Sequence, residues 1–262
     1  MNAASDPSPS PSPSPDTAPV RLRPLRWRDP FLWLGAGVRD FAAAWPVSLF
    51  FGVCFWIMAI VLGAVFRNLP EYTMSFVSGC FLVGPFLAMG LYEASRRHAL
   101  GLPQDLGASL TCWDRHLGSM GMLVLVLVVL ELLWGRASLV VFAVFFNTGM
   151  PSTTGVVQAV FNPDNWEFLA VYTVVGGVFA TLVFATCVVS IPMILDRDTD
   201  AITAGLTSFQ VVLGSPGVLL LWGVLIVALL LAAMVLPWVL GVLLAGPLLG
   251  HASWHAYRGS VG

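Results

Sequence analysis

The chain has 262 residues, of which 58% are hydrophobic and only 10% are charged, and its formal net charge is -2. A water-soluble domain carries about a quarter charged residues, so these side chains cannot cover a surface that faces water. The 12 basic residues also provide too little positive surface for nucleic-acid binding. We therefore expect an all-α membrane protein whose first partner is the lipid bilayer.

The N-terminal region divides into a tail and a basic, aromatic segment. Residues 1–20 contain the run PSPSPSPSPD, which has no apolar side chains to bury and predicts a disordered tail. No basic segment followed by an apolar core occurs there, so we expect no cleaved signal. Arginines then alternate with aromatic residues around Trp27 and Phe31, which predicts an amphipathic helix at the membrane interface. The transmembrane domain is expected to cover 28–260.

Six apolar segments are long enough to cross a bilayer, because about 20 helical residues span a hydrocarbon core of about 30 Å. The predicted spans are 46–66, 73–91, 117–134, 166–195 and two within 217–250. An interfacial or re-entrant piece is expected to follow Trp134. A single helix over 217–250 would measure about 50 Å, so we favour a turn near Pro237, with one long kinked helix as the alternative.

The arginines support alternating spans with both termini in the cytoplasm. Ten of them fall on one side of the six-span arrangement: Arg21, Arg23, Arg26, Arg28, Arg39, Arg96, Arg97, Arg115, Arg197 and Arg258. Only Arg67 and Arg136 fall on the other side. Basic residues concentrate in cytoplasmic loops, so this asymmetry predicts a multi-pass protein of a bacterial inner membrane.

The sequence also contains an internal repeat. Gly84-Pro85 matches Gly246-Pro247 at a shift of 162 residues, and Arg96 matches Arg258 at the same shift. A weaker middle copy has Ile191-Pro192 in the place of the Gly-Pro pair. We predict three units, 28–100, 104–197 and 198–260, each with an amphipathic lead-in helix on the cytoplasmic side and a helical hairpin.

Four prolines are expected to bend or interrupt helices: Pro85, Pro192, Pro237 and Pro247. A proline inside a helix frees a carbonyl group, which a neighbouring helix or a cavity must satisfy. Each bend therefore serves packing or lines a ligand pathway.

Three segments resemble a bacterial family of predicted integral membrane proteins, DUF2189. They are FVSGCFLVGPFLAMGLYEASRR, VVSIPMILDRDTDAITAGLTSFQVVLGSPGVLLLW and LLGHASWHAYR. The resemblance covers about 31–259. It implies a membrane protein and specifies no activity, cofactor or metal.

His251 and His255 lie four residues apart, so both face one side of a helix and could hold a metal or haem. The repeat places Glu93 at the position that corresponds to His255. These residues could form a polar patch in the core, although hydrogen-bonded histidines and an ion pair of Glu93 with Arg96 and Arg97 are the alternatives. We expect no metal and no cofactor.

Glu131 is a carboxylate inside an apolar run, where an unpaired charge costs a few kcal/mol or more. It is expected to pair structurally or to serve as a relay, with Arg136 five residues away. Three carboxylates in 196–200 invite a cation-binding interpretation, but capping of the next helix by Asp198 or Asp200 fits the spacing better.

The sequence predicts a non-catalytic membrane protein that supports a membrane complex or membrane organisation. No nucleophile-elbow, Walker or Rossmann motif is present, so we expect no enzymatic activity. Other membrane proteins or a second copy of the chain are the expected protein partners. The alternative is a small transporter whose pathway is lined by the bent even-numbered helices.

Overall fold

The computed structural model describes residues 21–69, 73–146 and 165–262, and these residues form an all-helical protein. The helices are α1 (Asp29–Ala43), α2 (Trp45–Asn68), α3 (Thr73–Ala99), α4 (Leu106–Thr111), α5 (Leu117–Phe145), α7 (Trp166–Cys187), α8 (Ser190–Arg197), α9 (Ala201–Gly214), α10 (Pro216–Val235) and α11 (Gly241–Ser260). Short 3-10 turns cover Asp114–His116 and Pro237–Val239. The predicted N-terminal tail lies outside the described residues.

Four helical stretches are long and apolar enough to cross a membrane. They are Trp45–Asn68, Leu106–Phe145, Trp166–Arg197 and Pro216–Val235. The second includes α4 and the turn before α5, and the third includes α8. α3 and α11 are not among the four, so the count of six spans stays a prediction.

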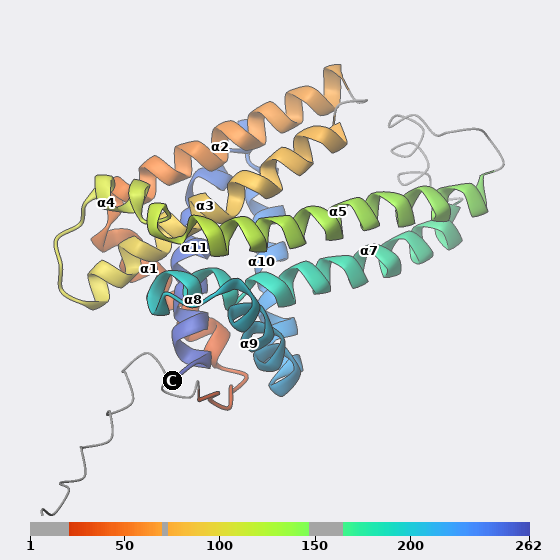
Figure 1. Ribbon diagram of the computed structural model, residues 1–262. Helices are drawn as coiled ribbons and strands as arrows, with labels where there is room; N and C mark the ends of the chain where they lie inside the picture. Colours follow the sequence, from red (N-terminus) through yellow and green to blue (C-terminus); the bar gives the residue numbers. More distant parts are fainter. Residues whose placement is uncertain (1–20, 70–72, 147–164) are drawn as a thin grey trace, which may run out of the picture.

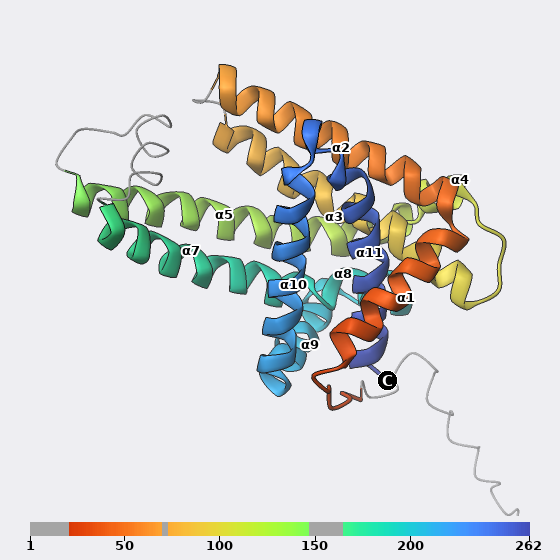
Figure 2. The ribbon, with the colours of Figure 1, turned by 180° about the vertical axis from the view of Figure 1, so that it is seen from behind.

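The long helices form antiparallel pairs, namely α2 with α3, α5 with α7, and α10 with α11 (Figure 1). In both views, α10 and α11 run across the direction of α5 and α7 (Figures 1 and 2). The turn between α10 and α11 lies beside the middle of α2, where Trp56 Nε1 donates a hydrogen bond to the Trp238 carbonyl at 2.9 Å. The last pair therefore turns at Pro237 but does not run alongside the other two.

The expected break after Trp134 is wrong, because α5 continues as one helix of 29 residues to Phe145. Gly135 does not end the helix, since a glycine inside a helix costs only about 1 kcal/mol relative to alanine. Arg136 is exposed on the outside of α5, so its charge does not force the chain to leave the helix either.

The four prolines have different positions relative to the helices. Pro85 and Pro247 lie inside α3 and α11, which continue past them. Pro192 is near the start of α8, after an interruption at 188–189 that separates α8 from α7. Pro237 begins the turn between α10 and α11, where Trp238 has a positive φ of 57°.

α11 is the central helix and packs closely against α1 and α2. A Cβ atom on Gly52 of α2 would lie 2.2 Å from the Leu243 carbonyl oxygen of α11, and one on Gly37 of α1 would lie 2.9 Å from the Ala252 backbone nitrogen. Both positions require glycine because two backbones meet there. The Leu243 carbonyl is also the one that Pro247 leaves without its helical partner. It lies against Gly52, so Pro247 is at a place of close helix packing.

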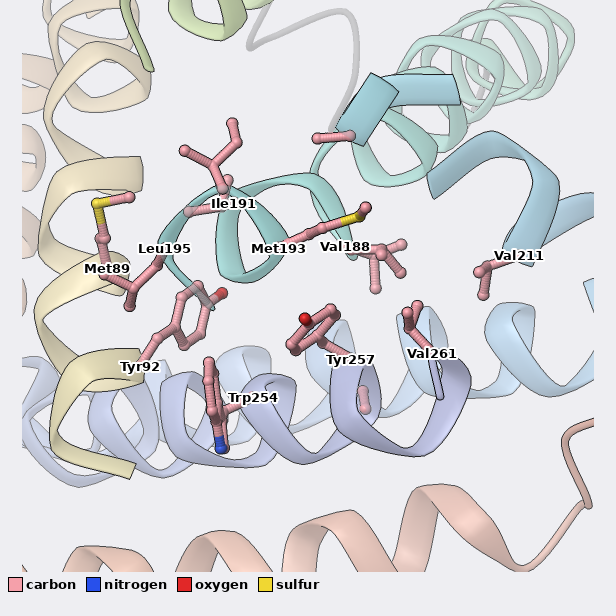
Figure 3. Close-up of a cluster of buried hydrophobic side chains, with 14 of the residues drawn as sticks. Met89, Tyr92, Val188, Ile191, Met193, Leu195, Val211, Trp254, Tyr257 and Val261 are labelled. Atoms are coloured by element: carbon pink, nitrogen blue, oxygen red, sulfur yellow. The ribbon is translucent and has the colours of Figure 1, made fainter. Parts of the chain in front are cut away.

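The other side of α11 faces a core of large side chains. Tyr92 of α3 stacks on Trp254 of α11 with ring centroids 6.4 Å apart, and Leu195 of α8 lies next to Tyr92 (Figure 3). Met193 of α8 and Tyr257 of α11 belong to the same cluster. This core joins three helices that are far apart in the sequence.

Candidate functional site

A buried carboxylate, Asp40, joins α1 to α3 and α11. Its side chain belongs to the stripe of α1 that faces α11, and the residue is only 4% exposed. Oδ1 lies 2.7 Å from His98 Nδ1, and Oδ2 lies 2.8 Å from His255 Nε2. Ser95 provides a further side-chain hydrogen bond. Three donors from two other helices therefore converge on one carboxylate.

These donors make Asp40 a stronger acid than usual. Burial opposes ionisation and raises the pKa of the carboxyl group, but the hydrogen bonds from His255, Ser95 and His98 outweigh it and lower the pKa to about 2. Asp40 precedes the first candidate span, which begins at Trp45. The carboxylate is therefore ionised at neutral pH.

His251 is the second member of the site and is completely buried. Its Nδ1 lies 2.7 Å from Ser95 Oγ, and its Nε2 lies 2.9 Å from Ser48 Oγ. A neutral imidazole has one donor and one acceptor nitrogen, so both serines are needed to satisfy it. If Ser95 donates to Asp40, then His251 Nδ1 donates to Ser95 and Ser48 donates to His251 Nε2. If Ser48 instead donates to the Ala44 carbonyl oxygen at 3.0 Å, then His251 Nε2 donates to Ser48 and Ser95 donates to His251 Nδ1. In the first of these arrangements, one continuous hydrogen-bonded chain joins Ser48, His251, Ser95 and Asp40. We call these four residues, together with His98 and His255, the polar cluster.

Part of the polar cluster has the serine, histidine and orienting group of a hydrolase, but a substrate has no access to them. A serine, a histidine and an orienting group in this order are the elements of nucleophilic catalysis. Ser48 and His251 are 0% exposed and Ser95 is 1% exposed, and none of them lines either cavity described below. No acyl group could approach Ser48 Oγ. The arrangement fastens helices together.

The sequence places His251 and His255 on one helix face, but the structure gives them different partners. His255 bonds to Asp40 and His251 to two serines, so they do not converge on a common point. Among the described residues, no group of three or more His, Cys, Asp or Glu side chains could hold a metal ion.

Glu93 lies in a separate group of charges. Its carboxylate accepts two hydrogen bonds from Arg96, at 2.7 and 3.1 Å, and lies 3.8 Å from Arg97. Glu93 is 4% exposed and lies at the edge of a polar cavity of ≈ 500 Å³ between α3, α4 and α8. The proposed patch of Glu93 with His255 is not formed by these contacts, because each residue has its own partner.

Glu131 is half-buried on α5, and Arg136 is exposed further along the same helix. Since α5 is continuous, the two residues point to different sides of it, five residues apart. Neither belongs to the polar cluster.

The carboxylates of 196–200 also separate. Asp200 caps α9 by accepting hydrogen bonds from the backbone nitrogens of Ile202 and Thr203, as its spacing predicted. Asp196 accepts from the hydroxyl of buried Tyr257 at 2.8 Å and from Arg258 at 3.0 Å. This link ties the C-terminal end of α8 to the end of α11.

A large apolar cavity lies between α2, α3, α10 and α11. Its volume is ≈ 710 Å³, and its wall includes Gly84 and Gly246 of the two Gly-Pro pairs. Tyr92 and Ser253 line it as well, and the Tyr92 hydroxyl has a side-chain hydrogen bond with Ser253. Ser253 is two residues from His251, so the cavity and the polar cluster lie on opposite sides of α11.

Asp40, Ser48, Ser95 and His98 were not identified from the sequence. The signal available for Asp40 was its place in a stripe with Trp33 and Gly37, where an apolar side chain is expected. Ser48 and Ser95 carry no such signal, because single serines are common in apolar helices.

Comparison with known proteins gave a match to a family model over residues 73–196. Neither curated proteins nor solved structures gave a match to this chain. The matched family segment contains α3 to α8, and thus Ser95 and His98, whereas Asp40, Ser48 and His251 lie outside it. It is shorter than the 31–259 that the motifs indicated. Residues 73–196 match the model of DUF2189, described as a predicted integral membrane protein, which confirms the resemblance to that family.

Proposed function

We propose that the chain is a non-catalytic membrane protein that supports a membrane complex or the organisation of the membrane. The observation that carries this proposal is that Ser48 and His251 of the polar cluster, which have the donors of a catalytic site, have no exposed surface. Such a cluster fixes how α1, α2, α3 and α11 pack. Buried hydrogen bonds of this kind are a means of holding helices together within lipid.

The test asks whether membrane complexes depend on the amount of the protein or on the hydroxyl group of Ser48. Native gels of gently solubilised membranes would compare complexes from cells with and without the protein, and a Ser48→Ala variant would be returned to the deficient cells. We expect Ser48→Ala to restore the wild-type pattern at equal protein abundance. A folded, equally abundant Ser48→Ala protein that fails to restore it would show that Ser48 does more than help the protein to fold. An unchanged pattern on removal of the protein would overturn the supporting role.

We also propose six spans in a bacterial inner membrane, with both termini in the cytoplasm. The pairs α2–α3, α5–α7 and α10–α11, each preceded by a shorter helix, support this arrangement. A Trp238→Cys variant without the four native cysteines should react with an impermeant thiol reagent from outside the cell. Arg258→Cys should react only after permeabilisation. A Trp238→Cys protein that is unreactive from both sides would place the turn inside the membrane.

A small transporter is the second candidate, because the apolar cavity includes glycines of both proline-containing helices, α3 and α11. Ions and sugars need polar groups along their path, and the side chains that line this cavity are mainly apolar. Proteoliposomes that move an apolar or amphiphilic solute would favour this candidate. The absence of such movement, with the native-gel effect retained, would favour the supporting role.

A further inference from the structure

The apolar cavity has the chemistry of a hydrocarbon site. Apart from the hydroxyl groups of Tyr92 and Ser253 and the thiol of Cys80, its lining side chains are apolar. A polar ligand would lose its hydration there without gaining hydrogen bonds, whereas a hydrocarbon chain loses nothing. The volume of ≈ 710 Å³ lies within the range of about 300–1,000 Å³ that is usual for ligand sites.

The cavity reaches the outer surface of the helices. Phe66 of α2 and Met234 of α10 line it and are 41% and 56% exposed. Both residues lie in helices that are long and apolar enough to cross a membrane. Val83 and Leu231, which follow and precede lining residues along α3 and α10 in the sequence, are exposed too. The solvent at this surface is therefore lipid, and the cavity is continuous with it.

The length of the cavity suits a hydrocarbon chain. The lining residues of α3 extend from Val77 to Tyr92, about 22 Å at 1.5 Å per residue. Half of a hydrocarbon core of about 30 Å is the depth of one leaflet, so one acyl chain fits this length.

A missing side chain keeps part of the space open. A Cβ atom on Gly84 would meet nothing within 4 Å, although the residue lines the cavity. We propose that this cavity binds one acyl chain of a membrane lipid, with Tyr92 and Ser253 closing its end. The inference goes beyond the supporting role and does not depend on it.

The test uses the full-length protein in nanodiscs that contain a phospholipid with a photoactivatable group on one acyl chain. Cross-linked residues are mapped by mass spectrometry in the wild type and in Gly84→Leu. Gly79→Leu is the matched control, because Gly79 lies on the same helix, has open space around its Cβ position and does not line the cavity. Ala88→Leu, which also fills the cavity, is the second variant.

We expect cross-links to concentrate on the lining residues of α3 and α11. Gly84→Leu and Ala88→Leu should reduce them by about tenfold or more, since a leucine side chain displaces several methylene groups. Gly79→Leu should leave them unchanged. Equal labelling of the lipid-facing sides of α5 and α7, an unchanged yield in both folded cavity variants, or cross-links to another polypeptide in the cavity would each overturn the proposal. None of these results bears on the native-gel test, so the two proposals can fail separately.

Discussion

Replacing Asp40 with asparagine removes the charge of the polar cluster while keeping its shape. The carboxylate accepts hydrogen bonds from His98, His255 and Ser95. Asparagine offers one acceptor oxygen and turns an NH₂ group toward one of the donors. One histidine must then change its tautomer or lose its hydrogen bond to this buried side chain. We expect the variant to fold with reduced stability.

The magnitude follows from the acidity of the buried group. The folded protein lowers the pKa of Asp40 from 3.8 to about 2, and such a change corresponds to about 2 kcal/mol in favour of the ionised form. Because the pKa is lower in the folded state, this stabilisation is present above pH 3.8 and is lost as the pH falls toward 2. The variant should therefore lose about 2 kcal/mol at pH 7 and almost nothing near pH 2.

Unfolding in mild detergent, followed by circular dichroism from pH 7 to pH 2.5, measures this difference. Asp114→Asn is the matched control, because Asp114 is exposed and forms no ion pair among the described residues. It should unfold like the wild type at every pH. Equal stability of Asp40→Asn and the wild type at pH 7 would refute the reasoning. A gap that persists unchanged to pH 2.5 would show that shape rather than charge matters at this position.

Two further changes test the packing of α11. Gly52→Ala should cost at least about 2 kcal/mol of unfolding free energy, because its Cβ would lie 2.2 Å from the backbone oxygen of Leu243. Gly177→Ala, whose Cβ would meet nothing within 4 Å inside α7, should not destabilise the protein and should raise its stability by up to about 1 kcal/mol in the same detergent assay. Tyr257→Phe should cost about 1–2 kcal/mol, because Asp196 loses a buried donor, and a wild-type unfolding midpoint would contradict that role.

Much of the helical architecture could be predicted from hydrophobic length. The first span was expected at 46–66 and α2 covers Trp45–Asn68, while the turn at Pro237 separates α10 from α11 as favoured. The direction of the last pair could not be predicted. Length and charge specify where a chain can turn, but the crossing angle depends on close contacts such as Gly52 with Leu243.

The candidate site could be predicted only in part. Helical spacing placed His251 and His255 on one face, but their partners lie far away in the sequence. Ser48 is 203 residues from His251, and Asp40 is 215 residues from His255. Local periodicity carries no information on such pairs. The repeat instead suggested Glu93 as a partner, and equivalent positions in two copies need not touch.

The polar cluster and the cavity are coupled through the rotation of α11. An apolar helix in lipid has no water-facing side to set its rotation, so specific contacts must do so. His251 and His255 hold one side of α11 toward Ser48, Ser95 and Asp40. Because successive residues turn by about 100°, this fixes the opposite side toward the cavity. A change in the polar cluster that leaves the chain folded should therefore alter the cavity, even though the two share no lining residue.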